Sequence, residues 1–294
     1  MPEGKIIKAL AGFYYVLTKD KRMVQCRGRG VFRKKKITPL VGDEVVFQAD
    51  NDTEGYILEI KERKNELVRP PIANVDQAIL IFSAVEPDFS TALLDRFLVL
   101  IEFNRIRPII CISKIDLINE VERERIMTYV KDYESAGYHV LLTSSVTEDG
   151  VEKLLPLLED EISVFAGQSG VGKSSLLNVL KPDLELETNM ISSHLGRGKH
   201  TTRHVELIEI GAGLVADTPG FSSLEFMELE MEDLNYCFPE IEKASESCKF
   251  RGCLHMQEPK CAVKEAVEAG DIPDYRYEHY KQFLQEIKER KPRY

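Results

Sequence analysis

A glycine-rich octapeptide in the middle of the chain is the feature that most constrains its fold. The octapeptide has the pattern G-x-x-x-x-G-K-S and reads Gly167-Gln168-Ser169-Gly170-Val171-Gly172-Lys173-Ser174. An apolar run over residues 162–166 precedes it and a helix-like run from Ser175 follows it, the context in which this pattern binds nucleotide phosphates rather than merely joining a strand to a helix. Glycines permit the tight turn that aims backbone N–H groups at an anion. We expect the loop and Ser175 to bind a nucleotide, Lys173 to stabilise the transferring phosphoryl group and Ser174 to bind Mg²⁺.

Length and composition indicate a soluble protein of several domains. Its 294 residues, 43% of them hydrophobic, suffice for two or three cores. No apolar run approaches the roughly 20 residues that span a bilayer, and the chain does not begin with a signal-peptide pattern. We expect a cytoplasmic protein with reduced cysteines and no membrane partner. Because no feature requires a dimer, we expect a monomer.

The first 67 residues predict an all-β barrel. Residues 1–66 carry 14 Lys and Arg against 10 Asp and Glu, whereas the whole chain has a net charge of -10. Alternating apolar runs separated by turn residues predict five strands, over residues 5–10, 13–18, 23–27, 44–49 and 56–60. An OB-type barrel fits this pattern, and its basic surplus indicates contact with RNA; a solvated basic face is the alternative.

The segment from Arg27 to Lys36 carries six positive charges, two glycines and the aromatic Phe32. Such a composition suits a loop whose cations grip RNA phosphates while a ring stacks on a base. We therefore expect Phe32 to contact RNA, the alternative being a loop that only faces solvent.

A proline pair in Arg69-Pro70-Pro71 predicts a stiff extended connector and a domain boundary near residue 68. Beyond it, short apolar strands alternate with helices, which predicts a mostly parallel α/β sheet buried on both faces. The expected strands are residues 77–84, 108–113, 139–143 and 162–166, and the expected helices are residues 91–103, 120–136 and 151–160. After the phosphate loop, residues 205–210 and 214–216 predict a hairpin that adds an antiparallel edge.

A second nucleotide element, Asp217-Thr218-Pro219-Gly220, follows the second strand of this hairpin. Its position at a strand end allows the Asp217 carboxylate to hold Mg²⁺ through water and the Gly220 N–H to sense a γ-phosphate. With the phosphate loop, it indicates a nucleotide switch.

Guanine recognition is indicated by Ser113-Lys114-Ile115-Asp116, which follows an apolar strand and resembles the Asn-Lys-x-Asp element of GTPases. In that family the aspartate accepts hydrogen bonds from guanine N1–H and the exocyclic amine, which adenine cannot donate. Ser113 stands where the family has asparagine, which leaves that first contact open, whereas Asp116 retains the discriminating carboxylate. The next strand is followed by Thr143-Ser144-Ser145, which resembles the last base-contacting loop, so we assign Ser144 and Ser145 to the base site.

Residues 198–204 lie where a GTPase places its switch threonine, and either Thr201 or Thr202 would bind Mg²⁺ when a γ-phosphate is present. Ras-like enzymes orient the attacking water with a glutamine after Asp-x-x-Gly; here that position is Phe221, which cannot hydrogen-bond. We expect His204, or as second choice His200, to orient the water. The alternative is that these histidines contact RNA phosphates or solvent.

The order of these elements is permuted, because the base-reading elements precede the phosphate loop, whereas in small GTPases they follow it. Such a circular permutation is tolerated when the new ends fall in surface loops. Because of the permutation, the segment after Asp217-Thr218-Pro219-Gly220 is joined almost directly to this element, which is the second of the two switch segments of a GTPase.

A metal site is indicated near the C-terminus by C-x4-C-x-H-x5-C, formed by Cys248, Cys253, His255 and Cys261. Three thiolates and an imidazole make the soft tetrahedral set of a structural zinc site; buried free cysteines and a surface histidine are the alternative. We expect Cys237 to stand outside the set. Helical runs over residues 262–269 and 275–288 have too few apolar residues for a large core, so we expect zinc to hold this mostly α domain together.

The barrel, the permuted GTPase motifs and the Cys-Cys-His-Cys module together resemble the ribosome small-subunit-dependent GTPase A (RsgA) family over essentially the whole chain. The resemblance implies a GTPase that binds the small ribosomal subunit and its rRNA late in assembly, is stimulated by the subunit, and leaves after hydrolysing GTP to GDP and phosphate. We accordingly expect an OB-fold RNA-binding domain over residues 1–67, a circularly permuted GTPase domain over 68–225 and a zinc-binding helical domain over 226–294.

Two other functions are alternatives. In a non-enzymatic module, GTP would only set the affinity for RNA, and no multiple-turnover phosphate release would occur. A P-loop ATPase or small-molecule kinase would let ATP compete with GTP, which Asp116 argues against.

Overall fold

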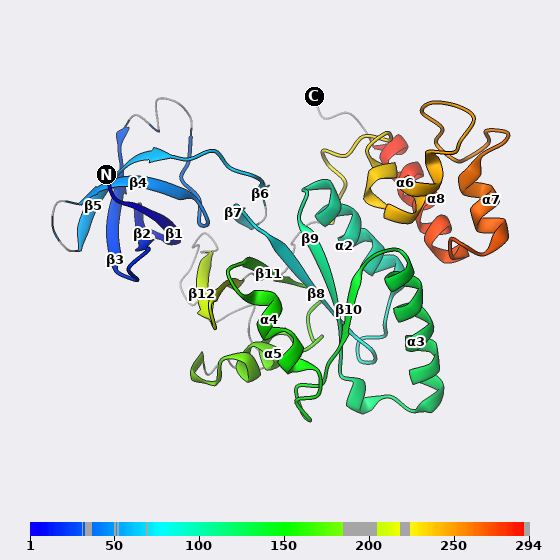
Figure 1. Ribbon diagram of the computed structural model, residues 1–294, viewed down its shortest axis with the longest axis horizontal. Helices are drawn as coiled ribbons and strands as arrows, with labels where there is room; N and C mark the ends of the chain where they lie inside the picture. Colours follow the sequence, from blue (N-terminus) through cyan, green and yellow to red (C-terminus); the bar gives the residue numbers. More distant parts are fainter. Residues whose placement is uncertain are drawn as a thin grey trace.

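The computed structural model describes residues 1–30, 32, 37–49, 51, 53–68, 70–184, 205–217 and 224–290 (Figure 1). Within these residues an eleven-stranded sheet begins in a barrel and continues into a layered α/β region, beside which a group of helices packs. No helix among the residues described is long and apolar enough to cross a membrane.

The N-terminal region is the five-stranded barrel that the sequence predicts. The strands run in the order β1-β2-β3-β5-β4, and β1 also pairs with β4 to close the barrel. In β4 and β5, buried and more exposed residues alternate, the period of two of a sheet with one face in a core. The strand bounds are β1 (Glu3–Leu10), β2 (Phe13–Thr18), β3 (Met23–Gly28), β4 (Glu44–Ala49) and β5 (Glu54–Ile60).

Phe32 lies in the barrel core, with 7% of its surface exposed. The prediction that its ring stacks on an RNA base is therefore wrong, because burial of apolar surface against the core places the ring out of reach of a ligand. A row of side chains that reach the surface lies elsewhere on the barrel: Phe13 is half-buried, and Arg27 and Tyr56 are exposed. The Arg27 guanidinium sits 4.9 Å from the ring centre of Phe13, and Tyr56, 42% exposed, is the register partner of Arg27 on β5.

The chain turns back where the proline pair predicts an extended connector. β6 (Glu66–Val68) and β7 (Pro71–Ala73) form an antiparallel hairpin. Leu67 and Ile72 of this hairpin are buried, and Ile72 also bridges Val41 of the barrel. Pro71 is tolerated as the first residue of a strand. The expectation of an extended connector is therefore wrong at this point.

The α/β region has strand order β10-β9-β8-β11-β13-β12, parallel except for the antiparallel β12. Leu80 and Phe82 of β8 pack in one cluster with helices α2 and α3, whereas Ile79 and Ile81 pack in another with α4 and α5, so both faces of the sheet are covered. The elements are β8 (Gln77–Ser83), α2 (Thr91–Phe103), β9 (Arg107–Ser113), α3 (Glu120–Ser135), β10 (His139–Leu142), α4 (Leu155–Leu158), β11 (Ile162–Ala166), α5 (Lys173–Leu180), β12 (Glu206–Ile210) and β13 (Gly213–Asp217).

The helix predicted over residues 151–160 is replaced by a 3-10 turn (Val151–Lys153) and the single turn of α4. Pro156 stands in the first turn of α4, where its missing N–H removes a donor that a continuous helix would need. The hairpin predicted after the phosphate loop is confirmed, and its strand β12 is not a free edge. β12 pairs with β1, which joins the barrel to the α/β sheet.

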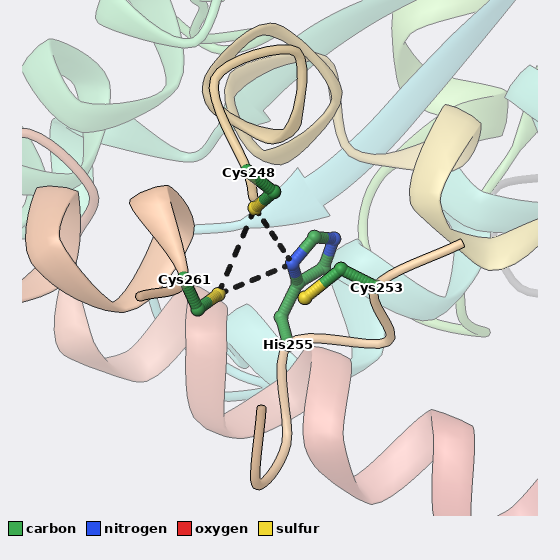
Figure 2. A group of neighbouring side chains, drawn as sticks. All are labelled: Cys248, Cys253, His255 and Cys261. Atoms are coloured by element: carbon green, nitrogen blue, oxygen red, sulfur yellow. Dashed lines mark hydrogen bonds between the residues drawn. The ribbon is translucent and has the colours of Figure 1, made fainter. Parts of the chain in front are cut away.

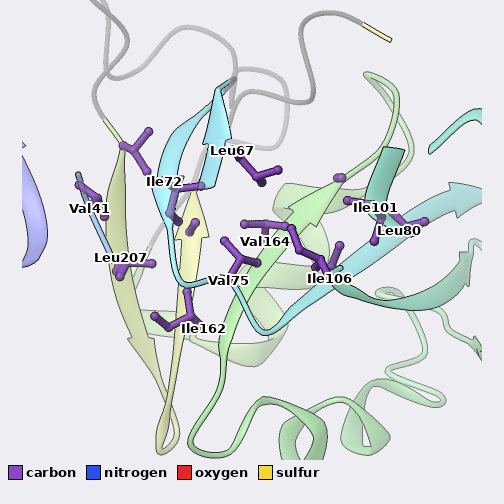
Figure 3. Close-up of a cluster of buried hydrophobic side chains, with 14 of the residues drawn as sticks. Val41, Leu67, Ile72, Val75, Leu80, Ile101, Ile106, Ile162, Val164 and Leu207 are labelled. Carbon is purple, nitrogen blue, oxygen red and sulfur yellow. The ribbon is translucent and has the colours of Figure 1, made fainter. Parts of the chain in front are cut away.

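The apolar interior also runs through this junction. Figure 3 shows Val41 of the barrel, Ile72 of the hairpin and Leu207 of β12 lying side by side. Val75 and Ile162 continue the same cluster toward the central strands. The barrel is therefore fixed on the sheet by buried side chains as well as by strand pairing.

The C-terminal helices pack on α2, away from the barrel (Figure 1). They are a 3-10 turn (Leu234–Cys237), α6 (Pro239–Ser245), α7 (Ala262–Ala269) and α8 (Asp274–Glu289). The expectation that this region lacks a large core is wrong. Its fifteen-residue buried cluster takes only Val99 from α2 and every other member, including Phe238, Tyr280 and Phe283, from residues 226–287, because apolar residues spread along that whole segment pack together.

A buried ionic network joins α8 to the α/β region. Arg276, 1% exposed, donates to the Asp95 carboxylate of α2 and, through two N–H groups at 2.7 and 3.0 Å, to Glu240 of α6. Asp95 also accepts from Tyr133 Oη at 2.7 Å and lies 2.6 Å from His279 Nδ1. Each carboxylate is thus paired, as burial of charge requires.

Candidate functional site

The glycine-rich loop joins β11 to α5 in the conformation that its glycines allow. Gly167, Gly170 and Gly172 have φ values of 146°, 83° and 94°, in the range that residues with a side chain rarely adopt. At Gly167 a Cβ atom would lie 2.1 Å from the Ile81 carbonyl oxygen, so no larger residue fits. The loop residues Gln168, Ser169 and Gly170 are exposed, whereas Val171 is buried. The loop therefore presents its backbone to solvent and is anchored at both ends.

Lys173 and Ser174 open α5 at the end of this loop. Lys173 Nζ donates to the Gly167 carbonyl oxygen at 2.8 Å and to that of Gln168. Burial lowers the pKa of Lys173 to about 8, because the ammonium loses hydration without gaining a negative partner. A phosphate beside it would supply that partner. Ser174 is buried and Ser175 half-buried in the first helical turn.

The predicted base-reading residues follow β9, next to the phosphate loop. The Ser113 hydroxyl donates to the Val171 carbonyl oxygen at 2.6 Å, so this position is tied to the phosphate loop despite the change from asparagine. Lys114 has φ of 59° and its ammonium donates to the Glu86 carbonyl oxygen. Ile115 and Asp116 form a 3-10 turn in which Asp116 is exposed.

The loop after β10 packs directly on the base-reading turn. Ile115 N–H donates to the Thr143 carbonyl oxygen at 3.3 Å. Ser144 is buried, and its hydroxyl oxygen accepts from the N–H groups of Val146 and Thr147, which shapes the loop; Ser145 is half-buried. Parallel strands β9, β10 and β11 therefore bring their carboxyl ends, and the loops that follow them, to one edge of the sheet.

Asp217 is the last residue of β13, which lies beside β11 in parallel, so it reaches the same sheet edge. Across the hairpin, Asp217 is the register partner of Glu206, the first residue of β12. The predicted residues Thr201, Thr202, His200, His204, Gly220 and Phe221 lie outside the described residues.

The four predicted metal ligands converge in the C-terminal region (Figure 2). The ligand atoms of Cys248, Cys253, His255 and Cys261 all lie within 4.8 Å of one another. His255 Nδ1 is 3.6 Å from Cys248 Sγ and 3.4 Å from Cys261 Sγ, and the two sulfurs are 3.9 Å apart. Tetrahedral bonds of about 2.3 Å to sulfur and 2.0 Å to nitrogen would require separations of about 3.5–3.8 Å. The donor set and its spacing thus fit a soft, four-coordinate metal ion.

The surroundings of the cluster orient its histidine. His255 Nε2 lies 2.9 Å from Asn235 Oδ1, which leaves Nδ1 directed at the sulfurs. Sequence reasoning missed Asn235, since it lies 20 positions upstream and outside the ligand spacing. Burial raises the pKa of Cys253 to about 12 and that of Cys261 above its usual value, while it lowers the pKa of His255. The donor set itself, three thiols and one imidazole, is the one that a soft metal ion binds, with the thiols as thiolates.

Cys237, as predicted, stands outside this cluster: it is buried, and its Sγ lies 3.4 Å from the Asp233 carbonyl oxygen.

The fold and site together define a P-loop GTPase whose motifs occur in circularly permuted order. A model of the RsgA GTPase family matches residues 60–227, and one of the RsgA N-terminal domain matches residues 3–57. The chain belongs to the RsgA GTPase family, as the sequence motifs predict.

Relatives and solved structures agree with this assignment. The chain is 71% identical to the small ribosomal subunit biogenesis GTPase RsgA of Bacillus cytotoxicus and 66% identical to that of Bacillus subtilis. Each match covers 100% of this chain and 100% of the relative. A crystal structure of YloQ, a circularly permuted GTPase, has a TM-score of 0.88 and 61% identity, covering 100% of this chain and 97% of that one. A crystal structure of YjeQ from Thermotoga maritima has a TM-score of 0.89 and 37% identity, covering 99% of each chain.

Proposed function

We propose that this GTPase acts on the small ribosomal subunit late in its assembly, binding the subunit's rRNA and hydrolysing GTP to GDP and phosphate under its stimulation. The observation that carries the proposal is the meeting of the phosphate loop, the Asp116 turn and the end of β13 at one sheet edge. The names of the full-length relatives supply the ribosomal partner. The row formed by half-buried Phe13 and exposed Arg27 and Tyr56 supports RNA contact by the barrel, since cations bind phosphates and rings stack on bases.

At the nucleotide site, Lys173 and the amides of the glycine-rich loop stabilise charge on the transferring phosphoryl group. Mg²⁺ would be held by Ser174, by Asp217 through water and by Thr201 or Thr202, and would neutralise phosphate charge. Gly220 would sense the γ-phosphate. Asp116 selects guanine, with Ser113, Lys114, Ile115, Ser144 and Ser145 completing the base site.

The water that attacks the γ-phosphate needs a positioning group, because Phe221 offers no hydrogen bond. We assign this role to His204, with His200 as the second choice. His204→Ala should abolish turnover stimulated by the small subunit while GTP affinity, measured by titration, stays at the wild-type value. Unchanged stimulated turnover in His204→Ala would remove His204 from the mechanism and direct attention to His200→Ala.

The Cys248, Cys253, His255 and Cys261 cluster would hold zinc as a structural ion. These four residues would fill all four positions of a tetrahedral ion and would leave none open for catalysis. We divide the chain into an OB-fold domain over residues 1–67, the permuted GTPase domain over 68–225 and the zinc-binding domain over 226–294. The protein would act as a cytoplasmic monomer without a membrane partner.

Steady-state GTP turnover, with and without added ribosomal subunits, tests the proposed function. We expect stimulation by small subunits, none by large subunits and no turnover of ATP. If GTP changes RNA affinity but turnover stays equally slow in every mixture, the protein is a GTP-gated RNA-binding module and the ribosome is not its activator.

A further inference from the structure

The first strand of the barrel changes neighbours next to the nucleotide site. Residues Glu3 to Lys5 of β1 pair with β4 inside the barrel. The register against β2 then shifts between Ile6 and Lys8, which marks a β-bulge at Ile7. Beyond the bulge β1 pairs with β12, with Lys8 opposite Glu206. Bulges bend a strand and re-aim its side chains, so the bulge explains how one strand serves both the barrel and the α/β sheet.

An ion pair reinforces this junction at one position. Lys8 Nζ lies 2.8 Å from a Glu206 carboxylate oxygen, and both side chains are about one-third exposed. Buried neighbours support the same strand, because Val205 and Leu207 on either side of Glu206 belong to the cluster that includes Ile6 and Ile7 of the barrel. The barrel thus holds the start of β12 by charge, by strand pairing and by apolar contact.

The start of β12 lies close in sequence and in strand register to residues proposed to act in GTP hydrolysis. Glu206 is two residues after His204 and directly opposite Asp217 in the hairpin register. One row across three strands therefore runs from Lys8 through Glu206 to the strand end at the nucleotide site. A shift of β12 would move the backbone from which both proposed switch elements leave the sheet.

We infer that Lys8 is a positioning residue for GTP hydrolysis: through Glu206 it fixes the strand that leads out of the segment carrying Thr201, Thr202 and His204. The inference rests on the proposed roles of those residues. The inference gives the barrel a part in catalysis besides RNA binding. A ligand that shifted the barrel would also shift β12, because Lys8 holds that strand. A partly exposed ion pair contributes modestly, so loss of the pair should reduce the hydrolysis rate constant by about two- to five-fold.

The test is single-turnover GTP hydrolysis by the full-length protein in excess over GTP, without ribosomes, so that changes in RNA binding do not enter. Lys8→Glu should lower the rate constant more than Lys8→Ala, and Glu206→Gln should match Lys8→Ala. GTP affinity should be unchanged, because Lys173 and Asp116 are untouched. The doubly changed Lys8→Glu, Glu206→Lys protein should recover most of the rate, since it restores the ion pair with reversed charges.

Lys5→Ala is the matched control, since Lys5 is on the same strand with Leu17 and Glu44 as its register partners. It should keep the wild-type rate constant. A wild-type rate constant in Lys8→Glu, or a charge swap that recovers nothing, would overturn the inference while leaving the GTPase assignment intact. A wild-type protein that binds GTP but hydrolyses it neither alone nor with added small ribosomal subunits would overturn both. Thermal unfolding midpoints of all variants separate a rate effect from loss of fold.

Discussion

Replacing Asp116 with alanine is expected to weaken GTP binding by about a hundred-fold or more. The Asp116 carboxylate is exposed in the turn after β9, where it would accept two hydrogen bonds from guanine. Each hydrogen bond to a charged group contributes about 1.5–3 kcal/mol. Because the side chain is exposed, its removal should change the free energy of unfolding by no more than about 0.5 kcal/mol. Titration with a fluorescent GTP analogue and thermal unfolding measure the two effects.

Two further variants make this test specific. Glu124→Ala removes a carboxylate of the same charge from the exposed surface of α3 and should bind GTP normally. Asp116→Asn offers an amide N–H that can donate to the 2-carbonyl of xanthine, so xanthosine triphosphate should become the better ligand. Undiminished GTP affinity in Asp116→Ala would mean that guanine is read at another position.

Loss of the metal is expected to have the largest effect on stability. Cys261→Ser, or chelation of the wild-type protein, should lower the stability of the C-terminal region by about 5 kcal/mol or more, because metal binding and folding are coupled in such sites. The apolar cluster shared with α2 should keep α8 in place, so the transition should divide into an early step for the metal loop and a later one for the rest. Near-UV circular dichroism during heating, with and without chelator, resolves the steps.

Cys237→Ser is the matched control for the metal prediction, because Cys237 is a buried cysteine of the same region outside the cluster. Purified Cys237→Ser should contain one zinc ion per chain, measured with a chromophoric chelator as the zinc released on unfolding. Purified Cys261→Ser should release none. A Cys261→Ser protein that keeps both its metal and the wild-type unfolding midpoint would refute the assigned ligand set.

The features that sequence reasoning predicted depend on local chemistry. Strands β4 and β5 of the barrel alternate in burial with a period of two, and the predicted ends of α2 and α7 coincide with the observed ones. The glycine-rich loop needs backbone angles that glycine supplies, as Gly167 shows. The cysteine and histidine ligands form a recognisable spacing. In each case the residues that carry the signal lie within a few positions of one another.

The features that sequence reasoning missed depend on contacts between distant segments. Phe32 is buried because the barrel closes around it, although its neighbours in sequence are basic. Asn235 meets His255 only after the helices have packed. The pairing of β1 with β12 joins residues almost two hundred positions apart, and a single lysine or glutamate gives no indication of its partner. No local pattern contains this information.

Helix α2 has a consequence for how the protein can be divided. Leu94, Leu98 and Ile101 pack against the sheet, whereas Val99 is buried among the C-terminal helices. Arg96 of the same helix donates to the Leu224 carbonyl oxygen and lies 4.7 Å from the ring centre of Phe226. A helix with apolar residues on two faces must be covered on both. A fragment ending at residue 225 would expose the apolar surface of α2 that the C-terminal helices cover. We therefore expect such a fragment to aggregate, and a chimera that replaces only the C-terminal helices to need a matching apolar surface against α2.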